Sequence, residues 1–198
     1  MKEFAGKVAL VTGAAHGIGY SYCTEAAKRG MKLSLVDIDG PAMEKAAEDF
    51  RALGAEVITN LCDVSVYDEC KAAIKNTMDH YGQIDTLLAN AGICTAGNIV
   101  NMPITDWEWA MNVNTMGVVY FVKEVLPIMI AQKTPCHLMI TASIAGLRAG
   151  MGANPPYFAS KHAAVAVAES VQDYVKGTGD DIGVAVFCPM YVHTYLDH

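Results

Sequence analysis

The sequence predicts an α/β fold in which a doubly wound parallel sheet carries helices on both faces. Short β-branched runs alternate six times with longer segments whose apolar residues recur at helical spacing. Such alternation requires parallel strands joined by right-handed helical crossovers. With 198 residues, of which 53% are hydrophobic and 18% charged, the chain can bury one sizeable core. We therefore expect residues 1–198 to form a single domain.

The expected elements follow from the period of the apolar residues. The strands are residues 7–12 (KVALVT), 32–37 (KLSLVD), 55–62 (AEVITNLC), 84–90 (IDTLLAN), 137–143 (HLMITAS) and 182–188 (IGVAVFC). Glycines break the pattern at Gly30, Gly40, Gly54 and Gly82. The longest predicted helix runs from Thr105 to Gln132. Because such a sheet binds its ligand beyond the carboxyl ends of its strands, the residues that follow each strand are the candidates for a functional site.

Composition excludes several classes of protein. Lys+Arg 14 against Asp+Glu 21 gives a net charge of -7 without a basic cluster, which argues against a nucleic-acid partner. The apolar run at the N-terminus is too short for a signal peptide. The most apolar later stretch is interrupted by Lys123, Glu124 and Pro127. We therefore expect a cytoplasmic protein without a membrane span. The six cysteines and six histidines show no CxxC or HExxH spacing, so we expect reduced thiols and no metal site.

A glycine-rich turn follows the first strand. The segment TGAAHGIG places glycines at Gly13, Gly17 and Gly19, in a G-x-x-x-G-x-G spacing. Glycines let the backbone approach a pyrophosphate, and the next helix offers N–H groups and the positive end of its dipole. Three glycines in a strand-to-helix turn are also compatible with a simple turn.

The second strand ends at Asp37, where a carboxylate suits the ribose hydroxyls of an adenosine. It would repel a 2'-phosphate by up to about 4 kcal/mol at 4 Å and an effective dielectric of 20. Ile38 and Asp39 follow, and no Arg or Lys stands in that turn. We therefore predict NAD as the cofactor, with NADP less favoured. Taken alone, Asp37 could equally cap a loop.

The segment PPYFASK starts the last predicted helix, since proline suits a first helical turn. Tyr157 and Lys161 are then four residues apart on one face, close enough for an ammonium to lie beside a phenol. By itself, this pair could simply cover a helix surface.

Taken together, these motifs resemble the short-chain dehydrogenase/reductase family. The resemblance rests on TGAAHGIG, Asp63-Val64, Asn90-Ala91-Gly92, Asn114, Ser143 and the Tyr157/Lys161 pair, in this order. It extends from about Lys7 to Thr194 and fits the branch with a TGxxxGxG loop and a Ser/Tyr/Lys active site. It implies a Rossmann-like domain that binds NAD(P) and contains the active site.

The resemblance assigns roles to individual residues. It implies cofactor contacts from Gly13, Gly17, Ile18, Gly19, Asp37, Asp63, Val64, Asn90, Ala91, Gly92, Tyr157, Lys161, Pro189, Val192 and Thr194. Asp63 would contact the adenine amino group, although Asp63 or Ser65 could instead cap the next helix. The Asn-Ala-Gly segment, Asn90 to Gly92, would let the backbone run under the cofactor, but a simple turn would use the same residues.

The resemblance also assigns the catalytic residues. Asn114 would hold a water that links the lysine to solvent, although Asn112 is equally misplaced in a helix and the bare pattern does not choose between them. Ser143 would bind the substrate oxygen, unless it is an ordinary loop serine. Tyr157 would be the general acid/base, because an ammonium about 4 Å away lowers a phenol pKa by up to three units from about 10. Lys161 would also bind the nicotinamide ribose.

Two features depart from the family. Met190 stands where a glycine usually follows the last strand, which weakens the inference for Pro189, Val192 and Thr194. The resemblance also implies a substrate lid, a further helix and a last strand, whereas the sequence stops at His198. Either further residues exist, or the protein is shortened and its site is open.

Two classes of function remain open. We favour an NAD(H)-dependent oxidoreductase that interconverts a secondary alcohol and a ketone, of sterol, sugar or acyl type. The alternative is a dinucleotide-binding or regulatory module without turnover. An apolar pocket wall is suggested by Ile144, Leu147, Met151 and Tyr191, although core packing would use the same residues.

We also expect self-association. Residues 109–122 contain no charge, and residues 163–168 read AAVAVA, so both helices should be covered on two sides. A second copy packed about a two-fold axis would cover them, which predicts a homodimer or homotetramer. The alternative is a fold in which the C-terminal segment of the same chain covers these helices.

Overall fold

Strands and helices follow one another in the predicted order in the computed structural model, which describes residues 3–148 and 153–192. The strands are β1 (Val8–Thr12), β2 (Lys32–Asp37), β3 (Val57–Leu61), β4 (Thr86–Ala89), β5 (Cys136–Thr141) and β6 (Ile182–Phe187). The helices are α1 (Gly17–Lys28), α2 (Gly40–Ala52), α3 (Tyr67–Tyr81), α4 (Ile104–Met111), α5 (Gly117–Gln132) and α6 (Pro155–Thr178), with a π-helical turn η1 (Asn112–Met116) and a 3-10 turn η2 (Ile144–Gly146).

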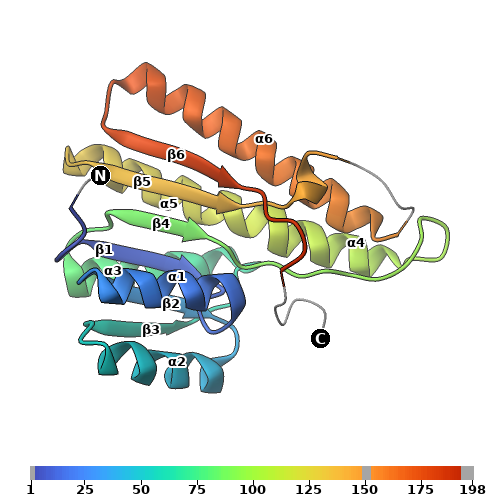
Figure 1. Cartoon of the computed structure of the whole chain (residues 1–198). Coiled ribbons are helices and arrows are strands. Elements are labelled where there is room, and N and C mark those ends of the chain that lie inside the picture. Colours follow the sequence, from blue (N-terminus) through green and yellow to red (C-terminus); the bar gives the residue numbers. More distant parts are fainter. Residues whose placement is uncertain (1–2, 149–152, 193–198) are drawn as a thin grey trace.

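The six strands form one parallel sheet in the order β3-β2-β1-β4-β5-β6 (Figure 1). Strand order reverses between β1 and β4, which pair with Val11 opposite Leu88. The chain leaves β1 toward one edge of the sheet and leaves β4 toward the other, so a crevice opens between their carboxyl ends. This topology confirms the predicted Rossmann-like fold.

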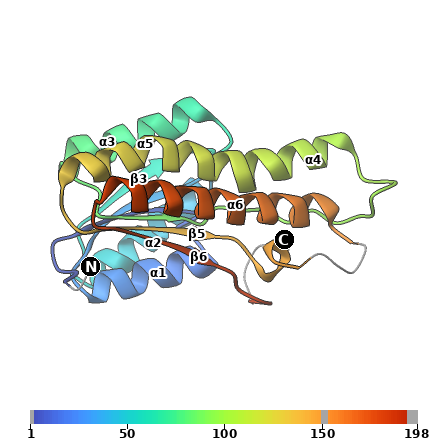
Figure 2. The same ribbon diagram turned by 90° about the horizontal axis from the view of Figure 1, so that it is seen from above.

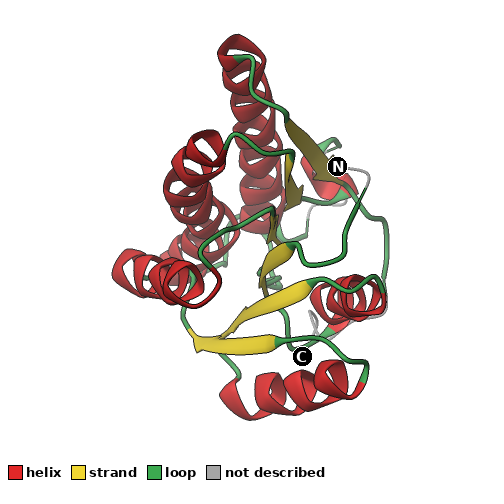
Figure 3. Cartoon of the chain, turned by 90° about the vertical axis from the view of Figure 1, so that its left-hand side faces the viewer, coloured by secondary structure: helices red, strands yellow, loops and turns green. Residues whose placement is uncertain are grey.

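Helices cover both faces of the sheet. Figure 2 shows α1 and α2 on one face and α3, α5 and α6 on the other. In β1, Leu10 packs in the core beneath α3, α5 and α6, while Ala9 and Val11 pack in the core beneath α1 and α2. Neighbouring residues of a strand point to opposite faces, so a strand covered on both sides is apolar throughout. Figure 3, viewed from the side, shows this sandwich of helices around the sheet.

The helix predicted from Thr105 to Gln132 differs from a single α-helix. It begins at Ile104, and the π-helical turn Asn112–Met116 separates α4 from α5. Asn114 lies in the middle of this turn, and its side chain bonds the backbone of a neighbouring loop. Hydrophobic periodicity does not register such a turn.

The same helical run is long and apolar enough to cross a membrane by length and composition alone. Half of its most apolar stretch is buried inside the protein, and Phe121 and Val125 are fully covered. This burial is typical of a core helix that packs on a sheet.

Candidate active site

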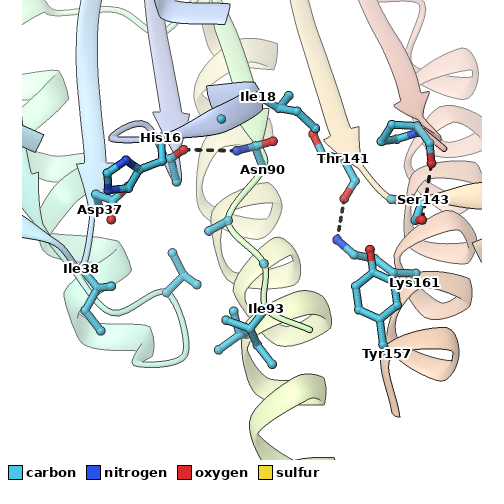
Figure 4. A pocket seen from close by; sticks show the side chains of 18 of the residues that line it. His16, Ile18, Asp37, Ile38, Asn90, Ile93, Thr141, Ser143, Tyr157 and Lys161 are labelled. Atoms are coloured by element: carbon cyan, nitrogen blue, oxygen red, sulfur yellow. Dashed lines mark hydrogen bonds between the residues drawn. The ribbon is translucent and has the colours of Figure 1, made fainter. Parts of the chain in front are cut away.

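A cavity of about 400 Å³ lies at the carboxyl ends of the strands, across the point where strand order reverses. Most of the residues predicted from the sequence contribute to its wall (Figure 4). These are Gly13, Gly17, Ile18, Asp37, Asp63, Val64, Asn90, Ala91, Gly92, Ser143, Tyr157, Lys161, Pro189 and Val192. The fold therefore brings together residues from seven separate segments of the chain.

Two predicted residues lie behind this wall. Gly19 is buried against the glycine loop, and Asn114 is fully buried between the loop after β4 and α6. Thr194 and Met151 are outside the described residues. Gly19 and Asn114 thus shape the cavity indirectly.

The glycine loop is fixed by close backbone contacts. Gly13 has a φ of +63°, and a Cβ on it would stand 3.0 Å from the Cα of Ala91. A Cβ on Gly19 would stand only 2.0 Å from the carbonyl oxygen of Gly13. Because neither place has room for a side chain, the loop presents bare backbone and the N-terminus of α1 to the cavity.

Hydrogen bonds join this loop to the one that follows β4. Thr12 Oγ1 accepts from the backbone N–H groups of Asn90, at 2.8 Å, and Ala91, at 3.0 Å. The Asn90 amide in turn donates to the carbonyl oxygens of Thr12 and Gly13, at 3.2 and 3.3 Å. The Asn90-Ala91-Gly92 turn is therefore held as a flat floor beneath the cavity.

Asp37 both shapes its loop and faces the cavity. Its Oδ2 accepts from Ala15 N at 2.9 Å, and its Oδ1 accepts from Asp39 N at 3.0 Å. Loop capping and ligand contact, which the sequence left as alternatives, are thus compatible here. His16, which the sequence analysis did not single out, also lines the cavity, and its Nε2 lies 3.5 Å from Asp39 Oδ2.

Asp63 organises the turn after β3. Its Oδ1 accepts from Ser65 N at 2.8 Å and from Ser65 Oγ at 2.7 Å. Helix α3 begins only at Tyr67, and its N-cap residue Val66 makes no side-chain cap. Neither Asp63 nor Ser65 is the helix cap that the sequence allowed, so Asp63 remains on the cavity wall.

The two asparagines differ in burial and contacts. Asn112 is exposed, whereas Asn114 is buried and its Oδ1 accepts from Ile93 N at 2.8 Å. Its Nδ2 donates to Ile93 O at 2.9 Å and to Ser160 Oγ at 3.0 Å. All of its polar atoms therefore tie the loop after β4 to α6.

Ser143 lies two residues beyond the end of β5 and lines the cavity. Its Oγ accepts from Ala145 N at 3.1 Å and lies 3.5 Å from Pro189 O. Ser143 thus caps the η2 turn and joins it to the segment after β6. The same hydroxyl faces the cavity beside the tyrosine of α6 (Figure 4).

Tyr157 and Lys161 share one face of α6. Lys161 Nζ is 5.7 Å from the centre of the Tyr157 ring and donates to Thr141 O at 3.0 Å. Burial lowers the pKa of Lys161 from 10.5 to about 8, an effect that the nearby thiols of Cys94 and Cys188 partly oppose. The lysine is still mostly an ammonium at neutral pH.

Thr141 has a feature that the sequence could not show. Its Oγ1 is buried and has no hydrogen-bond partner among the described residues, although Thr141 lines the cavity. Such groups are rare in native proteins.

Met190 does not distort the turn after β6. Only Lys133 and Asn154 are non-glycine residues with a positive φ in the described part of the chain, so this turn does not need a glycine. The Met190 side chain is exposed and lines the cavity. The departure from the family pattern is therefore compatible with the predicted path of the backbone.

The arrangement fits a nicotinamide dinucleotide. The close backbone packing at Gly13 and Gly19 leaves the N-terminus of α1 uncovered by side chains, which suits a pyrophosphate, and the Asp37 carboxylate faces the cavity, which suits the hydroxyls of a ribose. At the other end of the cavity, Ser143 and Tyr157 can reach a substrate oxygen. In residues 3–148 and 153–192, no group of three or more His, Cys, Asp or Glu side chains could hold a metal ion.

Comparison with known proteins gives the same picture. The family model for short chain dehydrogenase matches residues 7–198. A "CLA biosynthesis dehydrogenase/reductase" of Lactiplantibacillus plantarum is 44% identical over all of this chain and 69% of the relative.

Two solved structures are similar as well. A short-chain dehydrogenase/reductase of Burkholderia phymatum in complex with NAD has a TM-score of 0.96 and 37% identity, over 99% of this chain and 69% of that one. NAD+-bound xylitol dehydrogenase has a TM-score of 0.90 and 30% identity, over 96% of this chain and 72% of that one.

Proposed function

We propose that this chain, which belongs to the short-chain dehydrogenase family and is an oxidoreductase, interconverts a secondary alcohol and a ketone with NAD(H). The observation that carries the proposal is the shared cavity. One wall offers the glycine loop and Asp37 to a dinucleotide, and the other offers Ser143, Tyr157 and Lys161 to a substrate. Binding and acid/base groups are thus placed around one reacting centre.

In this proposal, a bound nicotinamide supplies the hydride acceptor or donor. In alcohol oxidation, Ser143 Oγ orients the substrate hydroxyl, and Tyr157 Oη takes its proton as the hydride leaves the same carbon. In ketone reduction, Tyr157 returns that proton to the carbonyl oxygen. The Lys161 ammonium stabilises the tyrosinate by electrostatic attraction and donates to the nicotinamide ribose. Asn114 and the floor formed by residues 90–92 hold these groups in place.

We further propose NAD rather than NADP as the cofactor. Asp37 presents a carboxylate to the cavity, and Asp39 adds a second one. A 2'-phosphate beside these two charges would be repelled. Both similar structures reported above contain NAD, which agrees with this choice.

The mouth of the cavity favours a substrate with an apolar flank. Trp109, Met190 and Val192 line the cavity and are exposed. Of the apolar wall predicted from the sequence, Ile144, Leu147 and Tyr191 are exposed but do not line the cavity. Exposed apolar side chains around a cavity are typical of a site for an apolar ligand. Of the substrate types that the sequence left open, we therefore favour an acyl chain or a sterol over a sugar. The name of the Lactiplantibacillus plantarum relative, which refers to CLA biosynthesis, is compatible with this preference.

We propose that the protein forms a homodimer. We also propose that it is cytoplasmic, which agrees with its six cysteines, none of which forms a disulfide. An apolar groove of about 410 Å³ lies along α5 and α6, which run side by side in Figure 2. Its walls include Val119, Leu126 and Val167, and an identical surface would cover it about a two-fold axis.

Ala166→Glu places a charge in this groove at an exposed position and should give monomers by light scattering, whereas exposed Gln172→Glu should not. A monomeric wild-type protein would refute the dimer.

The proposed function is tested by adding NAD+ and a panel of secondary alcohols to the purified protein and following the absorbance of NADH. The panel should contain apolar chains of increasing length as well as sugar alcohols. We expect turnover with the apolar alcohols. NADH binding without turnover on any member would instead support a regulatory dinucleotide-binding module.

A further inference from the structure

Ser160 lies next to Lys161 and is fully buried. Its Oγ accepts from Asn114 Nδ2 at 3.0 Å and donates to the carbonyl oxygen of Tyr157 at 2.9 Å. Its own carbonyl oxygen accepts from Thr115 Oγ1 at 3.2 Å. Two consecutive residues of the π-helical turn thus contact Ser160, one through its hydroxyl and one through its backbone.

The donor and the acceptor of each hydrogen bond that links Ile93, Asn114, Ser160 and Tyr157 are fixed. Ile93 N can only donate, so the oxygen of the Asn114 amide must face it, and the nitrogen must face Ile93 O and Ser160 Oγ. Since the Ser160 hydroxyl accepts from the amide, its single proton goes to another acceptor. The carbonyl oxygen of Tyr157 is that acceptor.

We propose that Ser160 is a positioning residue that sets the height of the Tyr157 turn above the floor of the cavity. The inference rests on the proposed acid/base role of Tyr157. Hydrogen bonds run without interruption from the loop after β4, through Asn114 and Ser160, to the backbone of Tyr157. The loop after β4 carries Gly92, where a Cβ would stand 3.1 Å from Asn114 Oδ1 and 3.2 Å from Lys161 Nζ. The Ser160 hydroxyl therefore fixes the positions of the turn 90–92, Lys161 and Tyr157 relative to one another.

A purely structural role makes a different prediction. If Ser160 only satisfies the Asn114 amide, its loss would lower stability and leave each folded molecule fully active. If Ser160 positions Tyr157, its loss changes the chemical step in molecules that remain folded, because small displacements of a catalytic group slow reaction strongly.

The test compares Ser160→Ala and Ser160→Cys with Thr178→Ala. Thr178 lies at the opposite end of the same helix, and its hydroxyl donates to Val175 O, also three residues earlier, at 2.9 Å. For Ser160→Ala we expect kcat per folded molecule to fall about tenfold or more, with the NADH dissociation constant unchanged. The primary deuterium isotope effect on kcat should rise. Ser160→Cys, whose thiol is a weaker partner, should lie between wild type and alanine.

A second readout needs no turnover. The tyrosinate absorbance of the NAD+-bound protein, taken as the difference from Tyr157→Phe, reports the pH at which this phenol ionises. We expect its midpoint to move upward in Ser160→Ala and to stay in place in Thr178→Ala. An unchanged midpoint, together with activity lost only in proportion to folded protein, would overturn the positioning role. If wild type forms no NADH, the proposed function fails, and the titration still decides the role of Ser160.

Discussion

The two halves of the sheet, on either side of the β1/β4 crevice, build their parts of the site in different ways. The half with β1, β2 and β3 uses backbone and close packing: Gly13 and Gly19 leave no room for side chains, and Asp37 accepts from one backbone N–H of the glycine loop and one of its own loop. The half with β4, β5 and β6 uses side-chain hydrogen bonds between distant segments, as in the contact of Asn114 with Ser160. The first half should therefore be sensitive to added volume, and the second to lost polar atoms.

Tyr157→Phe should have the largest effect and falls in the second half. It keeps the ring and removes the group proposed to carry the proton, so turnover should fall about 10²-fold or more. NADH affinity should stay nearly constant, because the dinucleotide wall is untouched. Steady-state kinetics and a fluorescence titration of NADH measure the two quantities. A variant that keeps most of its activity would show that Tyr157 is not the acid/base.

Gly19→Ala tests the first half by adding one methyl group. Its Cβ would meet the backbone oxygen of Gly13 at 2.0 Å, so the loop must shift, at a cost of about 3 kcal/mol in unfolding free energy. NADH binding should weaken strongly as well. Gly177→Ala is the matched control, since Gly177 lies in α6 with no atom within 4 Å of the added Cβ. Denaturant unfolding compares the two, and equal stabilities would contradict the close-packed loop.

Lys161→Met should separate stability from function. Burial lowers the pKa of Lys161 from 10.5 to about 8, so burying the charge costs about 3 kcal/mol of folding free energy. Loss of the bond to Thr141 O offsets about 1 kcal/mol of this, which leaves a net gain of about 2 kcal/mol for the variant near neutral pH. Turnover and NADH affinity should nevertheless fall.

The pH dependence of this gain has a defined sign. Below pH 8 the lysine is protonated in both folded and unfolded wild type, and the full penalty is present. Between pH 8 and 10.5 only the unfolded state keeps the proton, so wild-type stability rises and the advantage of Lys161→Met shrinks. Unfolding curves at several pH values measure it. A constant difference would mean that the ammonium is not destabilised by burial.

What the sequence could predict depends on whether a feature is formed by residues close together in the chain. The glycine loop, Asp37 and the Tyr157/Lys161 pair are local patterns, since each depends on residues close together in the chain. The parallel sheet with helices on both faces was also predictable, because it follows from the alternation of strands and helices. The π-helical turn and Ser160 were not, because they depend on which side chains from distant segments meet in the folded state. Asn114 is intermediate: the resemblance to the family chose it over Asn112, and its burial supplies the physical reason.

Asp37→Asn should have the smallest effect and tests whether one charge in the first half selects the cofactor. Wild type should bind NADH at least about tenfold more tightly than NADPH, a gap of about 1.4 kcal/mol. The variant keeps the size of the side chain and removes the charge, so this ratio should approach one.

The asparagine amide has one accepting oxygen in place of the two carboxylate oxygens that accept from Ala15 N and Asp39 N, so both affinities of Asp37→Asn should fall through a general disturbance of the loop. The ratio of the two dissociation constants removes that shared loss, because NADH and NADPH differ only in the 2'-phosphate. Asp49→Asn removes the same charge from α2, outside the cavity, where Asp49 accepts from the Tyr20 hydroxyl. If both variants keep the wild-type ratio, the charge of Asp37 does not select the cofactor. If both lower it equally, selection depends on the overall negative charge of this half instead.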